Sequence, residues 1–337
     1  MKIRYIALLA VLSSALFLNT SISHAQTTKT ERLFYFTDTP SARASLAKNI
    51  DKIDIFAPQT YSINKSLIPY GRLNKEVKNI IGNHKIKVMP LITNDGFRQD
   101  IIHNLLASST AQERVINFMI KEAKNNNYYG WQFDLEHISS TDRDLFTQFI
   151  KKTNDVFQKN DLALSIAVVV KVDESTTSDW YKNWSGVFDY KAISQNSDFI
   201  SIMTYDDPDS KGPTASIPYV IKTLEYILED GIEPQKISLG IPAYYWSWAT
   251  YPKLKRIRSG SYSRLLTIKA RTNYKENFSE ELGVPWISFK EYGVTYEVWY
   301  ENQKSFNLKT DLINKYGLRG FSMWVMGMED PSIWKSL

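Results

Sequence analysis

The sequence predicts an α/β protein built as a (β/α)8 TIM barrel with a small α+β insertion between strands seven and eight. Three observations support this prediction. Eight short apolar segments, rich in β-branched residues, alternate with amphipathic stretches along the chain. The chain has 337 residues and is 43% hydrophobic, which is ample for one large core. The interval 245–318 is too long for an ordinary connection, so we expect it to have structure of its own.

The first 25 residues have the features of a secretory signal peptide. Lys2 and Arg4 give a positive start, a mostly apolar run follows over 5–18, and Ser23 and Ala25 are small residues where signal peptidase cleaves. We therefore expect cleavage after Ala25 and a secreted or periplasmic protein. No segment is long enough for a comfortable membrane span, so we expect no integral membrane segment.

The eight candidate strands follow a short polar lead. They lie at 32–37, 53–61, 87–93, 130–137, 162–170, 199–205, 237–244 and 319–325. Such continuous apolar runs are typical of parallel strands that are covered on both faces. Amphipathic helices are expected between them, most clearly at 111–125, 142–158, 219–228 and 305–316. Eight such units predict a closed barrel.

The domain organisation follows from this pattern. We expect the barrel to comprise 30–248 and 299–337, interrupted by an insertion at 249–298 on the C-terminal rim. Within and beside the insertion, 262–270, 285–290 and 294–300 look like strands. The absence of cysteine excludes disulfides and a thiol nucleophile, and no dense Lys/Arg run indicates a nucleic-acid partner. We expect a monomer.

The fourth candidate strand places polar side chains on one face. Gln132, Asp134 and Glu136 alternate with bulky apolar residues, as the inner wall of a barrel requires. Two residues spaced i, i+2 have Cα atoms about 6–7 Å apart along a strand, so the carboxyls of their longer side chains can meet. One negative charge so near another raises the pKa of one carboxyl, which is how a protein keeps an acid protonated at neutral pH. The spacing suits equally a strand end whose carboxylates face solvent or bind a lysine.

Other candidate residues end later strands, where barrel enzymes place their chemistry. Met203, Tyr205 and Asp206 end strand six, Tyr244 ends strand seven and Trp324 ends strand eight. Taken singly, these residues suit a rim tyrosine, a turn aspartate or a core tryptophan just as well. The face of an aromatic ring also fits the apolar C–H face of a pyranose sugar.

Taken in order, these segments resemble glycoside hydrolase family 18, the chitinases and N-acetylglucosaminidases. The family's fourth strand has the motif D-G-x-D-x-D-x-E. Asp134 and Glu136 match its last two acids, whereas Tyr129 and Gln132 replace the first two. The strand-six residues match the family's M-x-Y-D motif. The seventh and eighth strands are similar to L-G-I-P-x-Y-G and G-x-x-x-W, with Tyr245 in place of the last glycine of the first.

Two early segments indicate which branch of the family the chain resembles. Residues 55–61 and 88–94 look like the bacterial peptidoglycan- and spore-cortex-lytic branch. That branch often has an amide where this chain has Gln132. The S-x-G-G motif of the common chitinase branch is not found after strand three.

The resemblance implies retaining hydrolysis of β-1,4 bonds after N-acetylglucosamine, in which the substrate's 2-acetamido group is the nucleophile. No cofactor and no metal are implied, and the partner is an N-acetylglucosamine-containing polysaccharide. The implied catalytic residues are Glu136 as acid and base, Asp134 and Tyr205, and the implied substrate-binding residues are Gln132, Asp206, Trp324, Met203 and Tyr244.

Alternatives remain at this stage. The chain could be a weakly active or inactive glycan-binding lectin on the same fold, or an endo-N-acetylglucosaminidase acting on N-glycans. A metal-dependent deacetylase needs clustered ligands, whereas His84, His103 and His137 are scattered. Chitin, peptidoglycan and N-glycan, and endo or exo action, are not distinguished by the sequence.

Overall fold

A computed structural model describes residues 29–337, and the predicted signal peptide lies outside these residues. Eight parallel strands pair in sequence, and the last pairs with the first, which closes the barrel. They are β1 (Glu31–Phe36), β2 (Ile55–Ile63), β5 (Leu91–Asn94), β6 (Gly130–Asp134), β7 (Ala163–Val169), β8 (Phe199–Met203), β9 (Ile237–Pro242) and β15 (Gly320–Trp324). The predicted (β/α)8 barrel is confirmed.

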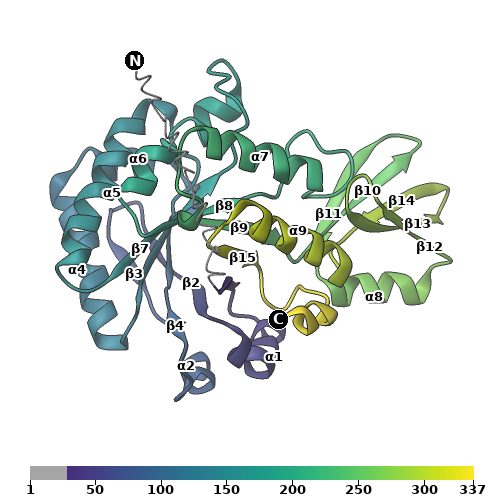
Figure 1. Ribbon diagram of the computed structural model, residues 1–337, viewed down its shortest axis with the longest axis horizontal. Helices are drawn as coiled ribbons and strands as arrows, with labels where there is room; N and C mark the ends of the chain where they lie inside the picture. Colours follow the sequence, from purple (N-terminus) through teal and green to yellow (C-terminus); the bar gives the residue numbers. More distant parts are fainter. Residues whose placement is uncertain (1–28) are drawn as a thin grey trace, which may run out of the picture.

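Helices surround the strands on the outside (Figure 1). They are α1 (Pro40–Asn49), α2 (Lys75–Ile81), α3 (Gln99–Leu106), α4 (Ser109–Asn126), α5 (Arg143–Gln158), α6 (Tyr190–Gln195), α7 (Ile217–Glu229) and α9 (Gln303–Tyr316). Side chains cap several N-termini; Ser108 accepts a hydrogen bond from Ala111 N and begins α4. None of the helices among residues 29–337 is long and apolar enough to cross a membrane. Two short strands, β3 (Pro69–Gly71) and β4 (Lys87–Val88), pair with β2.

The barrel strands are buried on both faces. Along β1, Leu33 and Tyr35 join a cluster that fills the barrel, whereas Phe34 and Phe36 pack in the larger cluster under the helices. All residues of β6 and β7 are buried. Burying each large apolar side chain stabilises the fold by about 1.5–3 kcal/mol. This two-sided burial is the physical reason for the continuous apolar runs in the sequence.

A second sheet of five antiparallel strands follows β9 and lies to one side of the barrel (Figure 1, green to yellow-green). Its spatial order is β11-β10-β14-β13-β12. In chain order, its elements are β10 (Tyr245–Tyr251), β11 (Lys255–Gly260), the helix α8 (Tyr262–Arg271), β12 (Lys275–Ser279), β13 (Val284–Glu291) and β14 (Val294–Trp299). The first strand therefore begins inside the range that we assigned to the barrel, and the division into two parts remains our proposal.

The predicted strand at 262–270 is wrong, because this segment is the helix α8. Ser261 caps it by accepting a hydrogen bond from Arg264 N, and Leu265 and Ile268, three residues apart, are buried beneath it. The apolar residues of this segment follow the helical spacing and not the alternation of a strand. β10, β11 and β12 were not predicted from the sequence.

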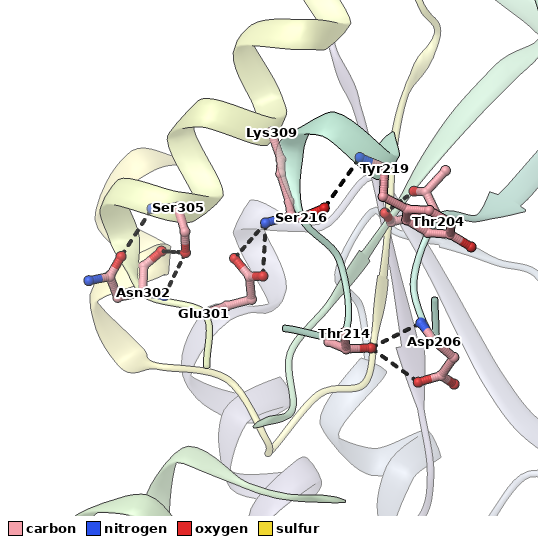
Figure 2. A network of polar contacts seen from close by, with 10 residues as sticks. Thr204, Asp206, Thr214, Ser216, Tyr219, Glu301, Asn302, Ser305 and Lys309 are labelled. Atoms are coloured by element: carbon pink, nitrogen blue, oxygen red, sulfur yellow. Dashed lines mark hydrogen bonds and ion pairs between the residues drawn. The ribbon is translucent and has the colours of Figure 1, made fainter. Parts of the chain in front are cut away.

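A buried ion pair lies where the chain passes from the second sheet back to the barrel (Figure 2). Glu301 follows β14, and Lys309 Nζ on α9 lies 2.8 Å from its Oε1, with both side chains essentially inaccessible. Burial raises the pKa of Glu301, and the charge of Lys309 opposes that rise. Asn302 and Ser305 form a capping box that begins α9 at the same place. These contacts hold the segment that joins β14 to α9.

Candidate active site

A cleft of about 910 Å³ opens at the C-terminal ends of the barrel strands. Of the eight residues that the sequence placed in the site, six line it: Glu136, Met203, Tyr205, Asp206, Tyr244 and Trp324. The other two, Asp134 and Gln132, are buried on β6, earlier in the chain than Glu136. Within residues 29–337 no group of three or more His, Cys, Asp or Glu side chains is placed to hold a metal ion.

Asp134 and Glu136 form a coupled pair of carboxyls. Burial, together with the smaller effects of the charges of Asp134 and Asp206, raises the pKa of Glu136 to about 9. Burial also raises the pKa of Asp134, to about 6, against hydrogen bonds from Gln59 and Glu136 that lower it. Near neutral pH Glu136 is therefore protonated and donates a hydrogen bond to ionised Asp134. A protonated carboxyl in a cleft can donate a proton to a leaving oxygen.

Glu136 does not lie on a strand, although the sequence predicted β-structure up to residue 137. β6 ends at Asp134, opposite the end of β5. The amide of Asn94 then continues the pairing: its Oδ1 accepts from Glu136 N at 3.2 Å and its Nδ2 donates to Glu136 O at 3.1 Å. One residue later, His137 has φ +56° and turns the chain away. A side chain therefore replaces the missing strand partner and positions the acid.

Replacing Asn94 with Ala is expected to lower kcat about tenfold and the free energy of unfolding by about 1–3 kcal/mol, because the backbone N–H and C=O of Glu136 lose their partners. The pH profile of kcat should also change, since the acid is less rigidly held. Asn49→Ala is the matched control: Asn49 is a buried amide on α1 that donates to Ser45 O. Equal losses of activity in both variants would contradict a positioning role for Asn94.

Two amides support the carboxyl pair from inside the barrel. Gln59 Nε2 lies 3.5 Å from Asp134 Oδ2. Gln132 is fully buried and donates to Ser165 Oγ at 2.8 Å and Ser201 Oγ at 3.0 Å. Because Gln132 does not line the cleft, its place in the structure suits support of the site and not contact with a ligand. As a neutral group it adds no charge beneath Asp134.

Asp206 and two tyrosines lie together in the cleft. Tyr244 donates a hydrogen bond from its hydroxyl to Asp206 Oδ1 at 2.6 Å. Thr214 Oγ1 donates to the same oxygen and accepts from Asp206 N (Figure 2). Tyr205 precedes Asp206 and lies edge-on to Tyr244, with 6.3 Å between ring centroids. Burial raises the pKa of Tyr205 well above its usual value, so its phenol stays a hydrogen-bond donor.

Aromatic side chains that the sequence analysis missed form the walls. Trp180 and Trp184 stack with 5.9 Å between centroids, and Trp184 stacks on the His137 ring. Trp246 and Trp248 line the cleft from β10. The alternation of these last two directly after strand seven was a visible signal, but their strand was not predicted. Together with Trp324, the cleft offers the flat apolar faces that suit sugar rings.

The comparisons with known proteins agree with the resemblance seen in the sequence motifs. The family model for "Glycosyl hydrolases family 18" matches residues 27–329. An uncharacterized glycosylase, YvbX, of Bacillus subtilis is 26% identical over 321 residues, covering 90% of this chain and 89% of that protein. The cortical fragment-lytic enzyme of Bacillus subtilis is 26% identical over 268 residues, covering 77% of this chain and 61% of that protein.

A solved structure shows the same fold. The spore cortex-lytic enzyme SleL of Bacillus megaterium has a TM-score of 0.81 at 24% sequence identity, covering 91% of this chain and 73% of that chain. At this identity the likeness concerns the fold alone.

Proposed function

The chain belongs to glycoside hydrolase family 18 and is a glycoside hydrolase, and we propose that it cleaves β-1,4 bonds after N-acetylglucosamine in a cell-wall polymer, either peptidoglycan glycan or chitin. We further propose that the configuration is retained and that the substrate's 2-acetamido group is the nucleophile. The observation that supports this most is the Asp134–Glu136 pair, in which one carboxyl is protonated and the other ionised at the cleft.

In the first step, Glu136 gives its proton to the glycosidic oxygen, and the bond from that oxygen to the anomeric carbon breaks. The acetamido oxygen forms the new bond to the anomeric carbon, giving a cyclic oxazolinium. Asp134 accepts a hydrogen bond from the acetamido N–H and offsets the positive charge that develops. Tyr205 donates to the acetamido oxygen and orients it. Because the acetamido oxygen and the anomeric carbon belong to the same sugar, they are close enough to react without a nucleophile from the protein.

In the second step, ionised Glu136 takes a proton from water, and the water oxygen attacks the anomeric carbon and opens the ring of the intermediate. Two inversions at one carbon give net retention. The ring of Trp324, half-buried against Tyr35, would lie under the sugar at the cleaved bond. Met203, Tyr244 and Asp206 would complete the same pocket.

The pH dependence of kcat/KM should be bell-shaped, because only one protonation state is active. Below about pH 6 Asp134 gains a proton and no longer offsets positive charge. Above about pH 9 Glu136 loses the proton that it must donate. The two limbs belong to the pair and not to either residue alone. Initial rates on a chitin oligosaccharide between pH 4 and 10 measure the profile, and a maximum near pH 4 would contradict the assignment.

Substrate and location are also proposals. The cortical fragment-lytic relative and the segments at 55–61 and 88–94 favour peptidoglycan over chitin. We propose export after cleavage at Ala25, and action as a monomer. The test is mass spectrometry of products from purified peptidoglycan, chitin oligosaccharide and a glycoprotein, with Glu136→Gln protein as control. Sugar binding without hydrolysis of any of them would favour a lectin, and release of the glycoprotein's glycans alone would favour an endo-N-acetylglucosaminidase.

A further inference from the structure

One wall of the cleft is strongly basic. β11 has the sequence Lys255-Arg256-Ile257-Arg258-Ser259-Gly260 and is an edge strand of the second sheet, paired with β10 only. Residues 256–259 of this strand border the cleft that holds Glu136, and Arg256 is exposed. Arg256 pairs with Trp248, which lines the cleft, whereas Arg258 pairs with Ser247 on the other face of the sheet, where its charge acts on Tyr245. The Arg256 guanidinium therefore belongs to the same cavity as Glu136.

The Arg256 guanidinium has free binding capacity. Among residues 29–337, no carboxylate lies within ion-pair distance of it, and its side chain makes no hydrogen bond within that part of the chain. The Arg256 guanidinium instead lies over the Trp246 ring, 4.3 Å from its centroid. Such stacking restrains the side chain while leaving its N–H donors available.

Arg256 lies close to residues of the proposed active site. Burial raises the pKa of Tyr244 well above its usual value, Asp206 raises it further, and the charge of Arg256 acts in the opposite direction. Arg256 thus lies near enough to Tyr244 for its charge to act there. The acids of the cleft lie elsewhere: Asp206 and Asp207 follow β8, and Asp206 is bound by Tyr244 and Thr214. The cleft has an acidic floor and a basic wall.

We propose that Arg256 binds a carboxylate carried by an N-acetylglucosamine-containing glycan, so that the enzyme prefers an acidic polymer of the peptidoglycan kind to neutral chitin. Arginine presents a planar fork of N–H donors that matches a carboxylate. In peptidoglycan the carboxylate belongs either to the lactyl ether of the muramic sugar or to the peptide attached to it. This inference rests on the proposed function and adds a subsite to it.

The test is affinity, measured by calorimetry on full-length mature protein carrying Glu136→Gln, so that the glycan is not consumed. Three tetrasaccharides of alternating N-acetylglucosamine and N-acetylmuramic acid are compared: one with free lactyl carboxyls, one with these converted to neutral methylamides, and one with stem peptides. Adding Arg256→Gln gives the test variant. Adding Lys255→Gln gives the control, since Lys255 is a cation on the same strand that does not line the cleft.

We expect the free-carboxyl glycan to bind about tenfold more tightly than the methylamide, and this advantage to disappear in the arginine variant but not in the Lys255 control. The advantage should also shrink at 0.5 M salt. An advantage confined to the peptide-bearing glycan would place the carboxylate on the peptide and would still support the subsite. Equal affinity for charged and neutral glycans, or equal losses for both in the arginine variant, would overturn it.

Failure of the proposed function gives a different result. In that case the protein with Glu136 intact would leave all three glycans, and a chitin oligosaccharide, uncleaved, whatever their affinities. Cleavage of all three with no preference for the acidic ones would instead overturn only the basic subsite.

Discussion

Replacing Glu136 with Gln is expected to lower kcat about 10²- to 10⁴-fold on any N-acetylglucosamine polymer that the wild-type enzyme cleaves. Gln has nearly the same shape as protonated Glu, and it can still donate a hydrogen bond toward Asp134. It cannot transfer a proton to the glycosidic oxygen or take one from water. KM should change little, because the cleft and its aromatic walls are unaltered. Initial rates with a chitin oligosaccharide measure the loss.

The same substitution should raise stability in alkaline solution. The pKa of Glu136 is raised in the folded protein, from 4.5 to about 9, so between these pH values the native state binds more protons than the unfolded state. Stability of the wild type therefore falls as pH rises through this window, whereas Gln does not titrate. The variant should have the higher Tm at pH 8 and a nearly unchanged Tm at pH 4. Normal turnover by this variant, or a lower Tm at pH 8, would contradict the assigned role of Glu136.

Replacing Asp134 with Asn is expected to lower kcat about 10²- to 10³-fold, the size of effect seen when one preorganised electrostatic group is removed from a transition state. Asn keeps the shape but has no negative charge to offset the oxazolinium. The charge of Asp134 is also one of the causes that raise the pKa of Glu136. The alkaline limb of the pH profile should therefore move to lower pH in this variant.

A matched control exists for this substitution. Asp142 is an equally buried carboxyl, hydrogen-bonded to His103, and it does not line the cleft. Asp142→Asn should keep kcat and the pH profile of the wild type. If Asp134→Asn left the alkaline limb where it is, the two carboxyls would not be coupled as described.

The barrel could be predicted from the sequence because it is built from burial patterns that are local to each strand and helix and that repeat along the chain. Strands buried on both faces appear in the sequence as apolar runs, and the helices that cover them appear as amphipathic segments. The ends of β6, β8, β9 and β15 then had to meet at one face, so Asp134, Tyr205, Tyr244 and Trp324 could be grouped without coordinates. The resemblance of these motifs to family 18 implied the same grouping.

What the sequence did not predict depends on contacts between distant segments. Nothing near Asn94 indicates that its amide would hold the backbone of Glu136, forty-two residues later. Gln132 shares the strand of Asp134, but its place beneath the cleft follows from Ser165 and Ser201 on neighbouring strands. Arg256 reaches the cleft only because the second sheet pairs β11 with β10. The misassigned helix α8 belongs to this same part of the chain.

The most direct test of the central claim compares two oligosaccharides that differ in one group. Both are chito-oligosaccharides of equal length; one has an acetamido group on the sugar preceding the cleaved bond, and the other has a free amine there. With the nucleophile supplied by the substrate, kcat/KM should fall at least about 10³-fold for the amine, approaching no detectable cleavage. Cleavage of both substrates at similar rates would show that the attacking group comes from the protein or from water, and would contradict the mechanism.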